Sequence, residues 1–145
     1  MRKALIVGTF NPFTVGHDNI VRRTLALFDE VVIGIGVNES KETKTSIDER
    51  ATKIRELYKD FTNIEVKTYS DLTVDFAQRE QVCCIVKGVR SVKDFEYERD
   101  QAEINKKLSG IETLLLPADP QFSAISSTLV RELQSFGRDV TEFLP

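Results

Sequence analysis

The sequence predicts an α/β fold: a single doubly wound parallel sheet of five strands with helices on both faces. Short apolar runs alternate with amphipathic segments along the chain, a pattern typical of parallel sheets covered by helices. Most of the runs consist of Val, Ile and Leu, as expected for strands buried on both faces. The 145 residues suit one domain of ordinary size, so we expect residues 1–145 to fold as one domain.

The apolar runs are the expected strands. They span residues 4–7, 31–37, 64–68, 82–86 and 113–116. Cys83 and Cys84 are adjacent in the fourth run, where we expect both to be small core residues. Adjacent cysteines cannot supply a disulfide framework or a spaced set of metal ligands. The sequence therefore favours a reducing setting and predicts no metal ligands.

The first two helices are predicted from apolar residues at helical spacing. After the first strand, these residues are Ile20, Val21, Leu25 and Phe28. After the second strand, they are Ile47, Ala51, Ile54 and Tyr58. Ser46 and Glu49 have the spacing of a capping box, which predicts that Ser46 caps the second helix.

The last three helices are expected over residues 74–79, 92–108 and about 128–136. Ser91 is suited to cap the helix over 92–108, and Gly110 lies just beyond its end. Apolar residues recur at helical spacing in the last helix, and Gly137 is expected to end it.

Composition and charge exclude several classes of protein. Hydrophobic residues make up 41% of the chain and charged residues 30%, with a net charge of -3, as in globular rather than disordered proteins. This charge argues against nucleic acid bound along an extended basic face, although cations can still gather in one pocket. No stretch approaches the roughly 20 apolar residues that span a bilayer. We therefore expect a cytoplasmic protein with small-molecule substrates.

The junction between the first strand and the first helix is expected to carry chemistry. Ligands of open α/β sheets bind beyond the carboxyl ends of the strands, and the sequence there is GTFNPFTVGH, from Gly8 to His17. Gly8 lets the backbone approach a ligand closely, Pro12 constrains the turn, and the N–H groups at the helix start suit a phosphate. His17 is the one histidine of the chain. Taken alone, it is better explained as a capping or packing residue.

Two segments at opposite ends of the chain resemble signatures of the nucleotidyltransferase superfamily. GTFNPFTVGH is similar to the T/H-x-G-H signature. ISSTLVRE, over residues 125–132, resembles the I-S-S-T/S-x-x-R motif that binds triphosphate at the start of the last helix. Without the first segment, the second would be explained as a serine-rich helix cap. Both stand at strand-to-helix junctions of the predicted sheet, which capping alone does not explain.

A closer resemblance, to the phosphopantetheine adenylyltransferase family, covers essentially the whole chain. GTFNPFTVGH resembles the family's GTFDP-x-T-x-GH. Further segments resemble the family in order and spacing: NESK ending at Lys41, SDLTVDFA over 70–77, KGVRSVKDFEYE over 87–98 and DVTEFLP over 139–145. The resemblance implies transfer of the adenylyl group of ATP to 4'-phosphopantetheine, with dephospho-coenzyme A and pyrophosphate as products.

The resemblance also implies roles for individual residues. Those expected to act in catalysis are His17, Lys41 and Arg90. Those expected to bind ATP are Thr9, Phe10, His17, Gly88, Val89, Arg90, Glu98, Phe122, Ser123, Ala124, Ile125, Ser126, Ser127 and Thr128. Those expected to bind phosphopantetheine are Thr9, Lys41, Thr73, Lys87 and Asn105, the two lysines at its phosphate. The family resemblance further implies a homohexamer.

The implied chemistry accounts for these residue types. A phosphate oxygen of the acceptor attacks the α-phosphorus of ATP and pyrophosphate leaves, so two polyanions must be held in line. Cations and helix N-termini offset their repulsion, and donors from His17 and from Ser127 or Thr128 would stabilise the developing charge. The acceptor phosphate is ionised near neutral pH, so neither a strong general base nor a covalent intermediate is expected. Mg²⁺ would be held mainly by the ATP phosphates, because the sequence offers no carboxylate cage.

Some positions depart from the family pattern. Asn11 stands where the family usually has Asp, Val7 where Pro is common, Thr45 where an aromatic residue is common, and Lys87 where Arg is usual. Lysine is a point donor, whereas arginine binds phosphate with a planar fork. Of the enzyme's properties, we therefore expect the affinity for the acceptor to be the one that Lys87 changes most. The chain ends at Pro145, where family members usually add a further helix.

The sequence leaves alternatives open. Lys41 and Lys87 are also explained as surface cations, Arg90 and Glu98 as an ordinary ion pair, and Thr73 as a helix cap. The alternative enzymes are a nicotinamide mononucleotide adenylyltransferase and a glycerol-phosphate cytidylyltransferase. A nucleotide-sensing module without turnover is the alternative outside enzymes. KGVRSVKDFEYE and SDLTVDFA favour phosphopantetheine over the other acceptors.

Overall fold

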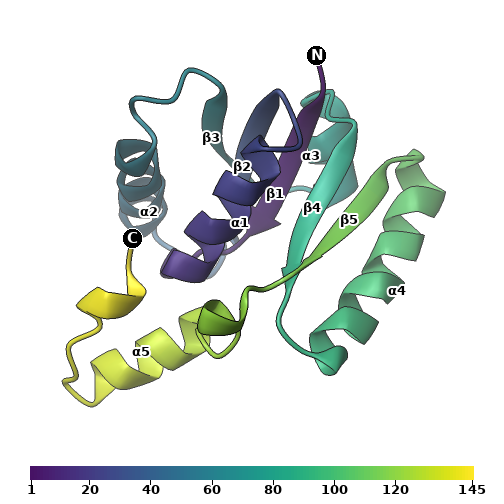
Figure 1. Ribbon diagram of the computed structural model, residues 1–145. Helices are drawn as coiled ribbons and strands as arrows, with labels where there is room; N and C mark the ends of the chain where they lie inside the picture. The colour runs from purple at the N-terminus through teal and green to yellow at the C-terminus, as the bar shows by residue number, and fades with distance from the viewer.

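A computed structural model, which describes residues 1–145, contains the predicted five-stranded parallel sheet. The strands are β1 (Lys3–Gly8), β2 (Glu30–Gly36), β3 (Ile64–Tyr69), β4 (Cys84–Val89) and β5 (Glu112–Pro117). Their order in the sheet is β3-β2-β1-β4-β5 (Figure 1). The chain thus winds outward from β1 in both directions, which is the doubly wound, Rossmann-like α/β fold that the sequence predicts.

The helices are α1 (Val15–Leu25), α2 (Lys44–Leu57), α3 (Thr73–Arg79), α4 (Val92–Ser109) and α5 (Ser127–Ser135), with 3₁₀ turns at Pro120–Phe122 and Thr141–Phe143. Ser91 caps α4 by accepting a hydrogen bond from the Asp94 N–H at 3.1 Å. Gly110 and Gly137 follow α4 and α5 with φ of 76°, so these predicted end signals are confirmed. None of the helices combines the length and apolar character needed to cross a membrane.

The predicted start of α2 and end of α1 are wrong. Thr43 caps α2 through its Oγ1, which accepts the Ser46 N–H at 3.1 Å. Ser46 therefore lies inside the helix and forms no capping box with Glu49. Phe28 lies beyond the end of α1, although it packs against the core.

The fourth strand begins later than the sequence predicts. Cys84 is its first residue and pairs with Ala4 of β1 and Glu112 of β5. Cys83 precedes the strand and is exposed, whereas Cys84 is buried. The expectation of two core cysteines is therefore correct for Cys84 alone.

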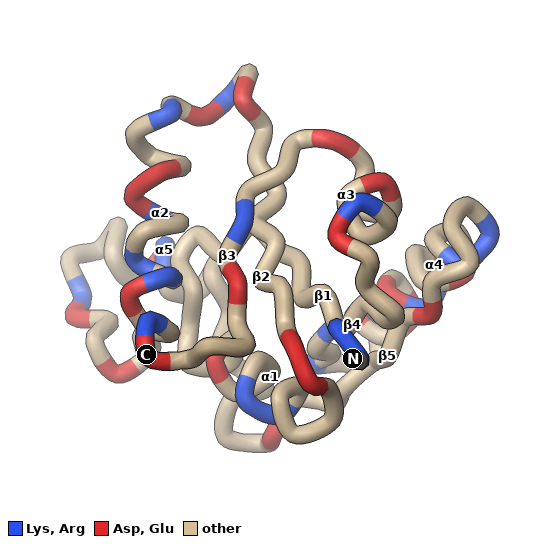
Figure 2. The backbone as a smooth tube through the Cα atoms, turned by 90° about the horizontal axis from the view of Figure 1, so that it is seen from above, with Lys and Arg blue, Asp and Glu red and all other residues tan.

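Each face of the sheet carries its own apolar core. On one face, α1 and α2 cover β1 and β2, with Val21, Ile33 and Ile54 among the buried residues. On the other face, Phe76 of α3 packs on Leu5. Helix α5 lies beyond the carboxyl ends of the strands (Figure 1). In Figure 2 the central strands carry few charged residues, whereas basic and acidic residues are interspersed along α2, α3 and α4.

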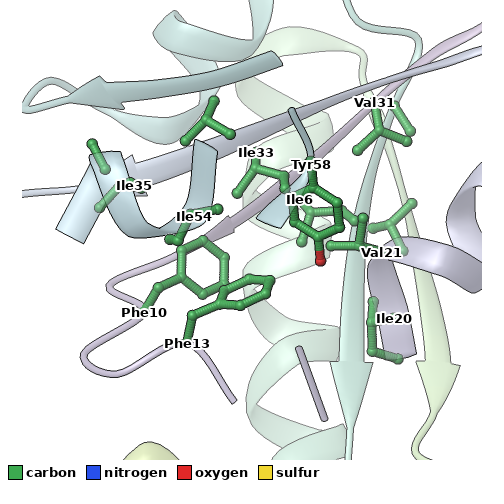
Figure 3. Packing of buried hydrophobic residues seen from close by; sticks show 14 of the residues in the cluster. Ile6, Phe10, Phe13, Ile20, Val21, Val31, Ile33, Ile35, Ile54 and Tyr58 are labelled. Atoms are coloured by element: carbon green, nitrogen blue, oxygen red, sulfur yellow. The ribbon is translucent and has the colours of Figure 1, made fainter. Parts of the chain in front are cut away.

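Aromatic rings anchor the loop after β1 in the first core. The Phe10 and Phe13 rings lie edge to face with centroids 5.2 Å apart, and Phe13 lies edge to face with Tyr58 at 6.1 Å. Figure 3 shows these rings beside the aliphatic residues of β1 and β2. Buried aromatic pairs stabilise beyond the area they bury, so this loop is a packed part of the structure.

β1 and β4 separate before their carboxyl ends. They pair from Ala4 with Cys84 to Ile6 with Val86. Beyond these residues, β1 continues along β2 to Gly8, and β4 continues along β5. The strand order reverses at this pair, so a crevice opens where such sheets bind ligands.

Gly34 on β2 tests how closely α3 packs on the sheet. A Cβ added there would stand 2.6 Å from Phe76 Cε2 and 3.2 Å from Leu5 Cδ1. We expect Gly34→Ala to lower the free energy of unfolding by about 1–3 kcal/mol, as overpacked cores do. Gly36→Ala on the same strand is the control. The nearest atom to a Cβ added there is Tyr69 Oη at 3.3 Å, so this change should lower the free energy of unfolding less. Urea denaturation measures both, and equal losses would contradict the packing described.

Candidate active site

A cavity of about 370 Å³ lies beyond the carboxyl ends of β1 and β4. Its lining includes Ile6 and Val86, the last residues at which these strands pair. The sequence-predicted residues that line it are Thr9, Phe10, His17, Lys87, Gly88, Arg90, Glu98, Phe122, Ile125, Ser126, Ser127 and Thr128. Segments from both ends of the chain therefore meet in one cavity.

Three of the predicted ATP-binding residues do not line this cavity. Val89 is the last residue of β4, pairs with Pro117 and is buried. Ser123 and Ala124 lie in the turn before α5, between residues that do line it. A matched segment therefore brings only some of its residues to the cavity.

Among the lining residues outside the predicted set are three with amide or charged side chains: Asn19, Asp94 and Arg131. Arg131 stands at the arginine position of the I-S-S-T/S-x-x-R motif, which is a signal that could have found it. Asp94 lies one helical turn after Arg90, the spacing of an ion pair. No pattern in the sequence singles out Asn19.

Thr14 and His17 cap each other at the start of α1. The His17 N–H donates to Thr14 Oγ1 at 3.4 Å, and the Thr14 backbone N–H donates to His17 Nδ1 at 2.9 Å. A ring nitrogen that accepts a hydrogen bond carries no proton, so the neutral imidazole holds its proton on Nε2. The capping interpretation of the single histidine is confirmed. The same bond leaves the Nε2–H as a donor on a residue that lines the cavity.

The surroundings keep His17 uncharged. Its ring stacks on Phe13 with centroids 5.3 Å apart and lies edge-on to Phe10 at 5.0 Å. Burial, and then the positive charges of Arg90 and Lys87, lower the pKa of His17 from 6.5 to about 4. At neutral pH the side chain is a neutral hydrogen-bond donor, which suits stabilisation of developing negative charge.

Helix α5 is bonded directly to the loop after β1. Ser127 Oγ donates to the Pro12 carbonyl oxygen at 2.7 Å, and Arg131 Nη1 donates to the Asn11 carbonyl oxygen. Ser126 caps the helix, so the serine-rich segment is a cap, as the alternative interpretation holds. It also lines the cavity. Hydrogen bonds thus hold the two motif segments together.

Arg50 on α2 is buried and links two loops at the site. Its Nη1 donates to the Thr9 carbonyl oxygen at 3.1 Å, and its Nη2 donates to Glu42. The hydrogen bond from Arg50, and then that from the Asn38 N–H, hold the pKa of Glu42 below its usual value. Arg50 therefore connects the loop after β1 to the loop after β2, which carries Lys41.

Two of the three cations at the cavity, Lys87 and Arg90, pair with acids of α4. Lys87 Nζ lies 3.3 Å from Glu98 Oε2, and Arg90 Nε lies 3.5 Å from Asp94 Oδ2. The alternative in which Arg90 pairs with Glu98 is therefore wrong. The side chains of Lys87 and Glu98 are 27% and 15% exposed, so Lys87 is not a solvated surface cation.

A smaller cavity of about 210 Å³ adjoins the first one. Both cavities are lined by Val7, Lys87 and Glu98. Thr73 and Asn105, the residues expected at the pantetheine arm, line the smaller cavity. Lys87 and Glu98 are its only charged lining residues, so it suits a neutral chain with a charged group at one end.

The structure distinguishes between the alternative interpretations of two expected acceptor-binding residues, Thr73 and Lys41. Leu72 rather than Thr73 is the N-cap residue of α3, and Thr73 Oγ1 instead shares a hydrogen bond with Tyr69 Oη at 2.9 Å. The helix-cap alternative for Thr73 is therefore wrong. Lys41 is exposed and lines neither cavity, as its surface-cation alternative holds.

The side chains form no metal cage. No group of three or more His, Cys, Asp or Glu residues comes together as ligands. The two acids at the large cavity, Asp94 and Glu98, are each paired with a cation.

The chain is similar to known proteins over its whole length. The cytidylyltransferase-like family matches residues 5–133. The phosphopantetheine adenylyltransferase of Bacteroides thetaiotaomicron is 52% identical over 145 residues, which is 100% of this chain and 96% of the relative. That of Porphyromonas gingivalis is 52% identical over 142 residues, 98% and 93% of the two chains. That of Streptomyces coelicolor is 40% identical over 145 residues, 100% and 91%.

Solved structures match the fold at lower identity. A putative nicotinate-nucleotide adenylyltransferase from Vibrio parahaemolyticus has a TM-score of 0.67 and 17% identity, over 99% of this chain and 94% of the other. A lipopolysaccharide core biosynthesis protein from Thermoplasma volcanium has a TM-score of 0.58 and 17% identity, over 82% and 97%. At these identities the likeness shows the shared fold.

The lowered pKa of His17 makes the stability of the folded chain depend on pH. Its pKa is about 4 in the folded chain and 6.5 in the reference state, so the unfolded chain takes up the proton first as the pH falls. The stabilising contribution is complete above pH 6.5 and is lost as the pH falls toward 4. Between about pH 7 and about pH 5, we expect wild type to lose about 2 kcal/mol more stability than His17→Gln.

Glutamine suits this comparison because it can accept the capping hydrogen bond without titrating. Urea denaturation of both proteins at both pH values measures the difference. Equal losses would show that the pKa of His17 is not lowered by folding.

Proposed function

The chain belongs to the phosphopantetheine adenylyltransferase family, and on this basis we propose that it transfers the adenylyl group of ATP to 4'-phosphopantetheine. The products are dephospho-coenzyme A and pyrophosphate, in a step of coenzyme A biosynthesis. The observation that carries the proposal is the 52% identity over the full chain to a named member. The two adjoining cavities support it, because one suits a polyphosphate and the other a neutral arm.

ATP would occupy the larger cavity. Residues in the first turns of α1 and α5 line it, and helix N-termini favour phosphate through their free N–H groups and partial positive charge. Thr9 and Phe10 would contact the nucleotide from the loop after β1. Gly88, in β4, and Arg90, in the loop that follows β4, would contact it from the opposite strand. Phe122 and residues 125–128 would surround the triphosphate, with Arg131 as a further cation.

Phosphopantetheine would extend from the smaller cavity toward ATP. Thr73 and Asn105 offer a hydroxyl and an amide to its arm, which carries amide groups of its own. Lys87, which lines both cavities, would bind the phosphate where the two substrates meet. Lys41 would add positive charge from the loop after β2, which Arg50 anchors.

The transfer would be a direct in-line displacement. The ionised phosphate of the acceptor attacks the α-phosphorus, the bond to the β-phosphate oxygen breaks, and pyrophosphate leaves. The chain supplies position and charge rather than a nucleophile: the His17 Nε2–H and the Ser127 or Thr128 hydroxyl would donate to phosphoryl oxygens as charge moves toward pyrophosphate. Arg90 would offset the repulsion between the substrates.

Mg²⁺ would enter with ATP. The side chains form no ligand cage, so the phosphates and water would hold it, in agreement with the few protein ligands this ion commonly uses. When bound, it would neutralise phosphate charge.

We further propose one nucleotidyltransferase domain over residues 1–145, a cytoplasmic location, where ATP is available, and a homo-oligomer. The support for self-association is α4, in which no residue is buried although Val92, Phe95, Ile104 and Leu108 are apolar and exposed. Six copies are expected from the family resemblance. Nucleic acid and membranes are not among the proposed partners.

The experiment that tests the function is an acceptor panel. The protein is incubated with ATP, Mg²⁺ and 4'-phosphopantetheine, nicotinamide mononucleotide or glycerol phosphate, and pyrophosphate and the adenylylated product are measured. We expect dephospho-coenzyme A to form fastest. Preference for another acceptor would reduce the assignment to the superfamily, and ATP binding without any product would favour a nucleotide-sensing module.

The role of His17 is tested by kinetics. We expect His17→Ala to lower kcat by about 10²–10³, the usual cost of one preorganised donor at a developing anion. The ATP dissociation constant should change far less, because the donor acts mainly in the transition state. His17→Gln, which can cap α1, is the control for structural damage. Normal kcat in His17→Ala would assign His17 to the helix cap alone.

A further inference from the structure

We propose that Glu98 is a counter-ion that the phosphate of the acceptor must displace from Lys87, so that Glu98 sets the affinity for the phosphorylated acceptor. The inference rests on the proposed function and concerns the wall between the two cavities. Val7, Lys87 and Glu98 line both cavities. Because Val7 is apolar, the ion pair of Lys87 and Glu98 is the charged part of this wall.

The pair is partly withdrawn from water. Lys87 Nζ and Glu98 Oε2 lie 3.3 Å apart, with side chains 27% and 15% exposed. Every other lining residue of the smaller cavity is uncharged. A ligand with its neutral arm in this cavity and a phosphate at its end therefore meets a single cation there, and a carboxylate already neutralises that cation.

An arriving phosphate gains little from a neutral pair. It would be attracted by Lys87 and repelled by Glu98 across a similar distance, and both forces are stronger where water is scarce. Net attraction appears only when the carboxylate leaves the ammonium. The free energy of the ion pair is therefore subtracted from the affinity for the acceptor phosphate.

The same exchange assists release of the product. Transfer converts the terminal phosphate of the acceptor, a dianion near neutral pH, into a bridging phosphoryl group with one negative charge. Lys87 then holds a weaker anion, and Glu98 competes for it more effectively. An arginine fork at this position would bind both anions more firmly, so Lys87 suits a contact that must be exchanged.

The other two cations of the larger cavity, Arg90 and Arg131, have partners other than Glu98. Arg90 pairs with Asp94 at 3.5 Å, and Arg131 Nη1 donates to the Asn11 carbonyl oxygen. Neither cation is paired with Glu98. Removing the charge of Glu98 should therefore act on the acceptor phosphate through Lys87, whereas Arg90 and Arg131 keep their own partners. Glu98 also lines the larger cavity, so ATP affinity is measured separately.

Calorimetric titration of wild type and Glu98→Gln with 4'-phosphopantetheine, without ATP, tests the proposal. Pantetheine, which has the same arm without the phosphate, is the matched ligand. We expect Glu98→Gln to bind phosphopantetheine about twofold to fivefold more tightly, the range of a partly exposed ion pair, and to bind pantetheine with unchanged affinity. Unchanged or weaker binding of phosphopantetheine, or an equal gain for pantetheine, would overturn the proposal.

Asp94→Asn is the matched variant. It removes one negative charge from the same helix, but Asp94 pairs with Arg90 and lines only the larger cavity. We expect no gain in phosphopantetheine affinity. A gain equal to that of Glu98→Gln would show an effect of overall charge and overturn the assignment to Glu98. Should Glu98→Gln not fold, Glu98→Ala must show the same selective gain.

The titration needs no turnover, so its result is separable from the proposed function. Wild type that binds phosphopantetheine without adenylylating it would contradict the proposed function. The affinities of Glu98→Gln and Asp94→Asn for phosphopantetheine would still decide whether Glu98 is the counter-ion. Wild type that forms dephospho-coenzyme A, with unchanged acceptor affinity in Glu98→Gln, would overturn this inference alone. A change confined to ATP affinity would assign Glu98 to the nucleotide and also overturn it.

Discussion

The hydrogen bond from the Thr14 backbone N–H to His17 Nδ1, 2.9 Å long, joins the fold to the proposed chemistry. It satisfies a backbone donor at the start of α1, and it fixes the proton of the neutral ring on Nε2. Phe10 and Phe13, which anchor the preceding loop in the core, also pack against the imidazole. Burial with Arg90 and Lys87 nearby keeps the ring uncharged. Helix capping, core packing and the donor proposed for the transferred phosphate thus depend on one side chain.

The rest of the site follows from the separation of β1 and β4. Their pairing stops at Ile6 and Val86, and the larger cavity opens beyond these residues. The start of α5, nearly the whole chain away, is held there by its bond from Ser127 to the Pro12 carbonyl oxygen. Acids of α4 then neutralise the two cations that β4 and its following loop bring to the cavity. In the proposed reaction, two anionic substrates would therefore compete with internal carboxylates for the positive charge of the site.

Local signals in the sequence predicted the fold well because runs of Val, Ile and Leu and caps such as Ser91 depend on few neighbours. Thr43 and Ser46 are both suitable caps for α2, and the choice between them depends on the preceding loop rather than on composition. The exposure of Cys83 depends on where β4 begins to pair, which the apolar run does not reveal. The matched segments predicted 12 of the 23 residues that line the larger cavity. They could not reveal that Val89 is buried, that Lys41 lines neither cavity, or that Glu98 pairs with Lys87. These features depend on the directions of side chains from different elements.

The most direct test of the role of His17 is nitrogen NMR of the imidazole, which is simple to assign because His17 is the only histidine. We expect a neutral ring near neutral pH, with the proton on Nε2 and an unprotonated Nδ1 that accepts the Thr14 hydrogen bond. A proton on Nδ1, or a charged ring at that pH, would contradict this assignment, since His17 could then not be the neutral Nε2–H donor proposed for the transferred phosphate.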